Sequence, residues 1–174
     1  MNSMISIVKV SEDDFQMLSE IGKLSFVESH SHSAAPDVID NYSKQKFSED
    51  AIRFELKDPA NIFHFIFYNN KPAGYSKIIF NSQLPEIKEK NVTKLERLYL
   101  LKEFYGLRLG QKLLQFNLDI SKENEQSAMW LYTWKENHRA IKFYLNNGFK
   151  IIGSYDFKLS ESHFNPNHLM FLKY

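Results

Sequence analysis

The chain has 174 residues, and its 22 Lys and Arg side chains nearly balance its 21 Asp and Glu side chains. This length predicts a single domain over residues 1–174, and the near-neutral charge argues against a general binder of nucleic acid or membrane surfaces. The absence of cysteine excludes disulfides, thiolate metal sites and a cysteine nucleophile. Because no apolar run has the length of a transmembrane helix and the first residues do not resemble a signal peptide, we expect a cytoplasmic globular protein.

Hydrophobic periodicity and turn residues predict the elements of the chain. In order, these are a strand over residues 5–10, a helix over 11–24, a helical stretch over 37–57, strands over 62–68, 72–80 and 94–101, a helix over 109–120, a strand over 128–133, a helix over 137–147, and strands over 149–157 and 167–174. Ser48 is a cap at which the second helical stretch restarts. This order predicts a mixed α/β domain of the α+β type, with antiparallel hairpins at both ends and a strand–helix–strand crossover in the middle.

Residues 95–114 (LERLYLLKEFYGLRLGQKLL) combine a predicted strand, a short loop with Gly106 and Gly110, and an amphipathic helix. The backbone N–H groups at a helix start have no partner within the helix, and the helix dipole favours an anion there. Basic side chains add positive charge to this segment, namely Lys102, Arg108 and Lys112. The segment predicts a cradle for a phosphate or pyrophosphate, although an ordinary strand-to-helix turn with a solvated basic face has the same pattern.

Residues 130–149 (WLYTWKENHRAIKFYLNNGF) predict a strand followed by a helix that starts at Asn137 and stops at Gly148. Tyr144 lies on this helix. Alone, the segment predicts only a strand–helix–strand unit, in which a single tyrosine is more often part of the core than a catalytic acid.

Together the two segments resemble the GNAT-type N-acetyltransferase superfamily. The more specific motif is WxxNxxAxxFYxxxGF, which starts at Trp134, and the segment over 105–110 resembles the acyl-CoA pyrophosphate loop. More narrowly, FHFIFYNNKPAGYSKI, LERLYLL and WKENHRAIKFYLNNGF are similar to bacterial spermidine/spermine acetyltransferases of the PaiA type. The loop departs from the family pattern, because Tyr105 stands in place of Gln or Arg and Arg108 replaces the middle glycine.

The resemblance implies a mostly antiparallel central sheet of about six to seven strands with about four flanking helices, and two parallel strands that splay apart in its middle. It also implies acetyl-CoA as co-substrate. Backbone groups of Leu98 and Leu100 would hold the pantetheine arm, and backbone N–H groups over 106–111 would hold the pyrophosphate. The full set of implied cofactor residues is Leu98, Tyr99, Leu100, Tyr105, Gly106, Leu107, Arg108, Leu109, Gly110, Gln111 and Asn137.

The reaction implied by the resemblance is direct attack of a neutral primary amine on the thioester carbonyl. Tyr144 would protonate the leaving thiolate, since a tyrosine with an ordinary pKa of about 10 is protonated at neutral pH. Glu96 would be the base that takes the proton of the ammonium substrate, directly or through water. A backbone N–H, that of Leu100, would stabilise the developing oxyanion. A structural salt bridge is the alternative role for Glu96.

The amine is expected beneath the first helices, where Phe26, Glu28 and His30 are the candidate substrate residues. Residues 28–58 contain seven acidic and four basic side chains. This excess of negative charge would attract a cationic polyamine, although a solvated helix surface has the same composition. His30 and His32 lie two residues apart, but no third ligand is evident, so we expect no metal site.

Other acceptors remain open at the level of sequence, namely another small amine, an aminoglycoside-like cation, and the N-terminus or a lysine of a protein. A different class of function is a non-catalytic CoA-binding regulator or sensor with the same fold, which the altered loop motivates. A purely structural interaction module would have no use for Glu96, Asn137 and Tyr144. Edge strands near the C-terminus could pair between two chains, so a homodimer is expected as an option.

Overall fold

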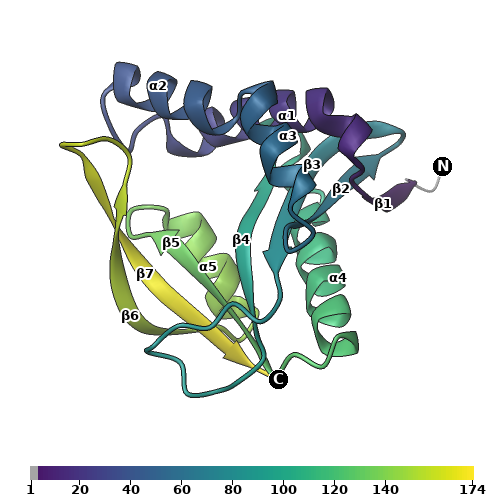
Figure 1. Cartoon of the computed structure of the whole chain (residues 1–174), viewed down its shortest axis with the longest axis vertical. Helices are drawn as coiled ribbons and strands as arrows, with labels where there is room; N and C mark the ends of the chain where they lie inside the picture. Colours follow the sequence, from purple (N-terminus) through teal and green to yellow (C-terminus); the bar gives the residue numbers. More distant parts are fainter. Residues whose placement is uncertain (1–3) are drawn as a thin grey trace. The chain divides into compact units, whose positions relative to one another are not determined.

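A computed structural model describes residues 4–174 of the chain (Figure 1). The elements in chain order are β1 (Ile5–Lys9), η1 (Glu12–Asp14), α1 (Phe15–His30), α2 (Pro36–Lys46), α3 (Glu49–Lys57), β2 (Ile62–Tyr68), β3 (Lys71–Ile79), β4 (Val92–Leu100), η2 (Lys102–Phe104), α4 (Leu109–Glu123), β5 (Ala128–Trp134), α5 (His138–Asn146), β6 (Lys150–Lys158) and β7 (Phe164–Lys173). The order predicted from sequence is confirmed except in one place, the second helical stretch.

The helical stretch expected over 37–57 is two helices, α2 and α3. Pro36 occupies the first turn of α2, where its missing N–H has no cost. Ser48 has an extended backbone, and its side chain accepts a hydrogen bond from the backbone N–H of Ala51 at 3.2 Å. This cap separates the two helices, so the described residues contain five α-helices where about four were expected.

The strands form one seven-stranded sheet in the order β1-β2-β3-β4-β5-β7-β6. The pairs β1–β2, β2–β3, β5–β7 and β6–β7 are antiparallel, whereas β4 and β5 are parallel. The register of β4 on β5 runs from Val92 opposite Ala128 to Lys94 opposite Trp130. Both strands continue beyond this register, as the resemblance implies for strands that splay apart. The predicted mixed, mostly antiparallel fold class is confirmed.

Two compact units divide the chain, and each is made of two chain segments. Unit 1 extends up to Ile78 and includes Arg97–Asn117, and unit 2 contains Ile79–Glu96 and Leu118–Tyr174. The chain passes from one unit to the other at the end of β3, within β4 and within α4. That the whole chain acts as a single domain stays a prediction.

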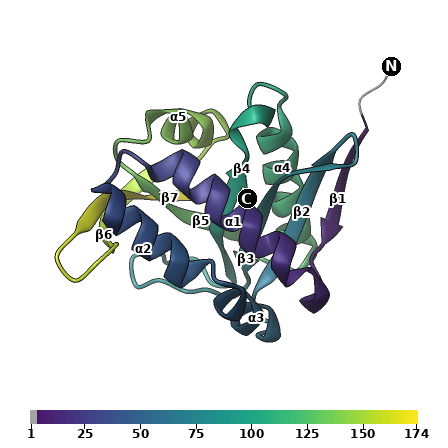
Figure 2. The same ribbon diagram turned by 90° about the horizontal axis from the view of Figure 1, so that it is seen from above.

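In unit 1 the alternation of side chains along β2 and β3 produces two different faces. His64 of β2 has its ring 4.8 Å from that of Phe116 on α4, and the hydroxyl of Ser76 on β3 donates to Asn117 on α4. Lys77 of β3 points to the other face and pairs with α3. Figure 2 shows α1, α2 and α3 together on one side of β2 and β3. The sheet of unit 1 therefore lies between α1–α3 and α4.

In unit 2 the loop between β3 and β4 is fixed onto the sheet. The indole N–H of Trp130 donates to the carbonyl of Ser82 at 2.7 Å, and the Ser82 N–H donates to the carbonyl of Val92. A buried cluster forms beneath this loop from Ile87, Val92, Ala128, Trp130 and Leu169. The loop therefore contributes the buried side chain of Ile87 to the core of unit 2.

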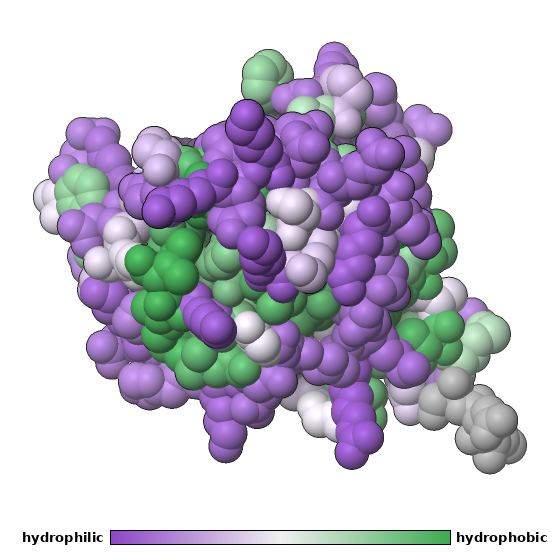
Figure 3. Space-filling view, turned by 90° about the horizontal axis from the view of Figure 1, so that it is seen from below, coloured by the Kyte–Doolittle hydropathy of each residue, from purple (hydrophilic) through white to green (hydrophobic). Residues whose placement is uncertain are grey.

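None of the helices in residues 4–174 combines the length and apolar character needed to cross a membrane. Figure 3 shows a face that is mostly hydrophilic, with a larger group of exposed hydrophobic side chains left of centre and smaller ones at its edge.

Candidate active site

The end of β4 in unit 1 carries the backbone groups expected to hold the pantetheine arm. The Leu101 N–H donates to the carbonyl of Ala73 on β3 at 2.9 Å. A Cβ atom added to Gly74 would lie 2.2 Å from the carbonyl oxygen of Tyr99 and 2.9 Å from the Cα of Leu100. Since real Cβ contacts are never this short, only glycine allows β3 to approach the end of β4 so closely. This contact fixes the backbone of Tyr99 and Leu100.

The candidate cofactor loop, residues 102–111, connects β4 to α4 through η2. Gly106 has φ +82°, and nothing lies within 4 Å of the place that a side chain would take there. Arg108 also has a positive φ, 58°, which is a left-handed conformation rare for a residue with a side chain. The helix begins with the bond from the Lys112 N–H to the Arg108 carbonyl. Arg108 thus adopts a backbone conformation typical of the glycine that it replaces.

This loop fits a diphosphate group. The N–H groups in the first turn of α4 have no acceptor within the helix, and the positive end of the helix dipole lies there. Lys102, Arg108 and Lys112 are exposed, so their charges are available to a bound anion. The open backbone at Gly106 leaves room for close approach of a phosphate. The residues present therefore suit the pyrophosphate of acetyl-CoA.

Replacing Arg108 with glycine is expected to weaken CoA binding about tenfold, because a charge-assisted hydrogen bond to phosphate is lost. The fold should not be destabilised, because glycine adopts the positive φ of residue 108 without strain. Calorimetric titration with CoA and thermal unfolding measure the two effects. Arg108→Lys is the matched control that keeps the charge. Tighter binding by Arg108→Gly would show that the guanidinium only crowds the loop.

The last turn of α1 contains the three candidate substrate residues. Phe26 is buried, with its ring against those of His30, Tyr42 and Phe47. The Glu28 carboxylate accepts a hydrogen bond from the backbone N–H of Lys102 at 2.8 Å. Phe26 therefore packs in the core beside His30. Its predicted contact with the acceptor stays a prediction.

His30 lies between aromatic rings. Its ring stacks on that of Phe26 with centroids 4.6 Å apart, and it meets the ring of Tyr99 edge-on at 5.9 Å. Burial lowers the pKa of His30 to about 4, although a hydrogen bond between its Nδ1 and the Phe26 carbonyl opposes this shift. His30 is therefore neutral at physiological pH, and its predicted role toward the acceptor would be that of an uncharged group.

Two histidines make the stability of the fold depend on pH. Burial, followed by the charge of Lys9, lowers the pKa of His64 to about 4, as burial does for His30. Both are protonated in the unfolded chain below their ordinary pKa of 6.5, but remain neutral in the folded chain down to about pH 4. Because the unfolded state binds more protons in this range, the free energy of unfolding falls as the pH drops from about 6.5 toward 4.

We expect the midpoint temperature of thermal unfolding to decrease between about pH 7 and about pH 5. Over this range His30 alone should lower the free energy of unfolding by about 2 kcal/mol. His64→Phe keeps an aromatic ring against Phe116 and removes one titrating group. Its midpoint should decrease less over the same range. An equal decrease in wild type and variant would exclude His64 as a source of the pH dependence.

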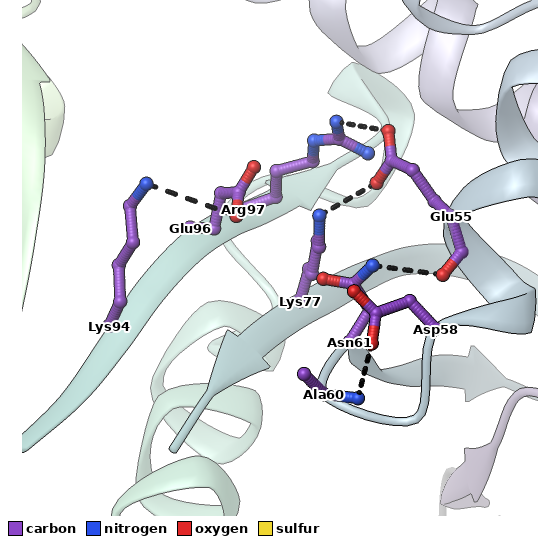
Figure 4. Close-up of polar contacts among 8 residues, drawn as sticks. All are labelled: Glu55, Asp58, Ala60, Asn61, Lys77, Lys94, Glu96 and Arg97. Carbon is purple, nitrogen blue, oxygen red and sulfur yellow. Dashed lines mark hydrogen bonds and ion pairs between the residues drawn. The ribbon is translucent and has the colours of Figure 1, made fainter. Parts of the chain in front are cut away.

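A buried ion-pair network in unit 1 joins α3, β3 and β4 (Figure 4). One oxygen of Glu55 is 2.7 Å from the Lys77 Nζ, and the other is 2.8 Å from a guanidinium nitrogen of Arg97. The side chains of Lys77 and Arg97 are only 5% and 11% exposed. Burial raises the pKa of Glu55, but Arg97 and Lys77 outweigh this effect and hold the pKa below its usual value. Glu55 is therefore ionised in the folded protein.

The end of α3 is fixed around this network. The Asn61 side chain donates to the Glu55 carbonyl at 2.9 Å, and the Asp58 carboxylate accepts from the Ala60 N–H at 2.9 Å (Figure 4).

Sequence reasoning counted Glu55 only as one acid among several on a helix surface. The missed signal was the pair of charged residues within apolar strands, Lys77 and Arg97, since buried cations need a partner.

Glu96, the candidate base, belongs to unit 2. Its carboxylate lies 3.9 Å from the Lys94 Nζ, and both side chains are 26% exposed (Figure 4). Lys94 also lies over the ring of Trp130, 5.3 Å from its centroid. A partly exposed carboxylate can exchange protons with solvent, so this position is compatible with a base. Its catalytic role stays a prediction.

Asn137 and Tyr144 lie on α5 in unit 2. The Asn137 side-chain oxygen accepts a hydrogen bond from the Ala140 N–H at 3.1 Å, so this residue caps the helix. The predicted contact of Asn137 with the cofactor stays a prediction. Tyr144 is buried, and its ring packs edge-on against those of Phe143 and Phe149. The motif found in the sequence thus has a structural role as well as its predicted catalytic one.

Several acids of residues 28–58 have structural partners. Glu28 and Glu55 make the contacts described above, Asp58 closes the turn after α3, and Asp40 pairs with Lys44 on α2. The exposed acids Asp37, Glu49 and Asp50 lie in the first turns of α2 and α3, where they complement the helix dipoles. Residues 4–174 contain no group of three or more His, Asp or Glu side chains that could hold a metal ion.

The model of the acetyltransferase (GNAT) family matches residues 16–149. The chain belongs to the GNAT family. This places it among acyltransferases whose named relatives are N-acetyltransferases, so the predicted family and enzyme class are confirmed. Acetyl-CoA as the co-substrate agrees with this family.

Relatives of this GNAT protein align over most of its length. It is 27% identical, over 90% of its own chain and 91% of the other, to the "uncharacterized N-acetyltransferase in pepI 3′ region" of Lactobacillus delbrueckii subsp. lactis. It is 26% identical, over 84% of its own chain and 89% of the other, to spermidine N(1)-acetyltransferase of Thermoplasma acidophilum. The crystal structure of PaiA N-acetyltransferase from T. acidophilum with coenzyme A has a TM-score of 0.78, 23% identity, and coverage of 98% of this chain and 99% of that one.

Proposed function

We propose that this GNAT protein transfers the acetyl group of acetyl-CoA to a primary amine. The observation that carries the proposal is the candidate cofactor loop, in which Gly106 and Arg108 have positive φ and lead into the first turn of α4. The alternative of a non-catalytic CoA sensor depended on the side chain at position 108. Since Arg108 keeps a glycine-like backbone, this substitution does not argue for loss of activity.

The proposed chemistry needs one base and one acid. Glu96 accepts a proton from the ammonium form of the acceptor, and the neutral amine then forms a C–N bond with the thioester carbonyl. The Leu100 N–H stabilises the oxyanion, and its backbone is held in place by the close contact with Gly74. As the C–S bond breaks, the Tyr144 hydroxyl gives its proton to the thiolate of CoA. The second proton of the attacking nitrogen passes to the Tyr144 oxygen, directly or through water, and the proton on Glu96 returns to solvent.

The acceptor class that we propose is a small cationic amine, with polyamines as the first candidates. Two observations support this choice: the name of the relative from T. acidophilum, a spermidine N(1)-acetyltransferase, and the exposed acids at the starts of α2 and α3. Negative charge at this surface would attract a polycation and discriminate against anionic acceptors. Peptide amines remain the competing acceptors in an assay.

Calorimetric titration of the purified chain with acetyl-CoA and with CoA tests the proposal at its first step. We expect saturable binding of both. A salt dependence of the affinity would agree with contacts between Lys102, Arg108, Lys112 and the phosphates. If neither acetyl-CoA nor CoA binds, the proposed function is contradicted for every acceptor.

Replacing Tyr144 with phenylalanine is expected to lower kcat by about 100-fold or more, the typical contribution of a general acid. The affinity for acetyl-CoA should change by less than about threefold, because the ring that packs against Phe143 and Phe149 is retained. Steady-state kinetics and calorimetry measure the two quantities. Equal losses of turnover and affinity would assign Tyr144 to binding and not to proton transfer.

A further inference from the structure

The Glu28 carboxylate makes a contact that links distant parts of unit 1. Its Oε2 accepts a hydrogen bond from the Lys102 N–H at 2.8 Å, and these residues lie 74 positions apart in the sequence. Glu28 is in the last turn of α1, which no sequence pattern connects to the candidate cofactor loop. The bond therefore depends on the tertiary fold and not on local structure.

The contact lies at the start of the candidate cofactor loop. Lys102 is the first residue of η2, and Leu101, the residue at the cap position, makes no side-chain capping bond. The first N–H groups of a helical turn lack partners within the turn. Glu28 supplies an acceptor and a negative charge at this end, as a cap residue would.

A second contact fixes the same turn of α1 to β4. The ring of His30 lies edge-on to that of Tyr99, 5.9 Å between centroids, and also stacks on Phe26. Tyr99 and Leu101 lie just before η2. The last turn of α1 therefore contacts both the strand that leads into the loop and the first residue of the loop.

From these contacts, and resting on the proposed function, we propose that Glu28 is a positioning residue for the cofactor. It caps η2 from α1 and holds the candidate cofactor loop in the conformation that binds the pyrophosphate. This differs from the role expected from the sequence, in which Glu28 contacts the acceptor amine. Because the Glu28 carboxylate is bound to the backbone N–H of Lys102, replacing Glu28 should weaken binding of the cofactor more than binding of the acceptor.

The test compares Glu28→Ala and Glu28→Gln with Glu20→Ala, an exposed acid on the same helix. Hydrogen exchange of the Lys102 amide, measured without cofactor, reports the cap itself. In Glu28→Ala this exchange should accelerate about tenfold, as expected for loss of a hydrogen bond to a charged group. The Kd for CoA should rise by about tenfold, and KM for the amine should change by less than about twofold. Glu28→Gln keeps an oxygen acceptor, so its amide exchange rate and its Kd for CoA should lie between those of Glu28→Ala and wild type. Both quantities should be unchanged in Glu20→Ala.

The outcomes separate this inference from the proposed function. If wild type binds CoA and Glu28→Ala raises only KM for the amine, Glu28 contacts the acceptor and the inference is overturned. Unchanged exchange of the Lys102 amide would also overturn it. If wild type itself fails to bind CoA, the proposed function fails, while the exchange measurement still decides whether Glu28 caps η2.

Discussion

Replacing Glu55 with glutamine is expected to lower the free energy of unfolding by about 3–5 kcal/mol, the cost of leaving buried charges without their partner. Glu55 is the shared counter-charge of Lys77 and Arg97, which are 5% and 11% exposed. Glutamine has nearly the same size and can still accept hydrogen bonds. The loss would therefore come from the missing negative charge and not from a cavity. Chemical denaturation measures it.

Two comparisons make this prediction specific. Asp40→Asn removes one partner of the exposed Asp40–Lys44 pair, whose side chains are 57% and 69% exposed, and should cost less than about 1 kcal/mol. Because the pKa of Glu55 is lowered in the folded state, its contribution is present above its ordinary pKa and is lost as the pH falls through the folded value. Glu55→Gln should lack this part of the acid dependence. Equal destabilisation by the two substitutions would contradict a special role of the buried network.

Replacing Gly74 with alanine is expected to reduce kcat by about 100-fold, because displacement of catalytic groups by about 1 Å has effects of this size. The new Cβ would lie 2.2 Å from the Tyr99 carbonyl oxygen and 2.9 Å from the Leu100 Cα, so the strand ends must move apart. Leu100 is the residue whose backbone N–H is proposed to stabilise the oxyanion. Overpacking should also lower the free energy of unfolding by about 1–3 kcal/mol.

Gly153→Ala is the matched control for this substitution. Gly153 also lies in a strand, but a Cβ there would be 3.6 Å from its nearest neighbour, a side-chain atom of Leu169. Its kcat should stay within about twofold of wild type. Purified Gly74→Ala that folds and retains wild-type kcat would show that the close approach of β3 to β4 does not position the reacting groups.

Local signals in the sequence were sufficient for much of the fold. Ser48 marked the boundary between α2 and α3 because an N-cap acts within a few residues of itself. The glycines and basic residues after β4 marked the candidate cofactor loop for the same reason. The positive φ of Arg108 was not predictable from residue type, since an arginine at that position gives no indication of a left-handed backbone.

The contacts that fix the candidate site are between residues far apart in the chain. Glu55 meets Lys77 and Arg97 across 22 and 42 positions, and Glu28 meets Lys102 across 74. No repeating pattern in the sequence indicates these pairings, because the packing of separate elements decides which side chains meet. Charged residues within apolar strands could have signalled that a partner exists, but not which acid it is.

The central claim is that the chain moves an acetyl group from acetyl-CoA to an amine. The most direct test incubates the purified protein with acetyl-CoA and a panel of amines that includes spermidine, a peptide N-terminus and a lysine peptide. Release of the CoA thiol and the mass of the acetylated amine are measured together. We predict thiol release that depends on a small cationic amine and matches the acetylated product in amount. Binding of acetyl-CoA without thiol release or acetylated product for any amine would contradict the claim and favour a CoA-binding sensor.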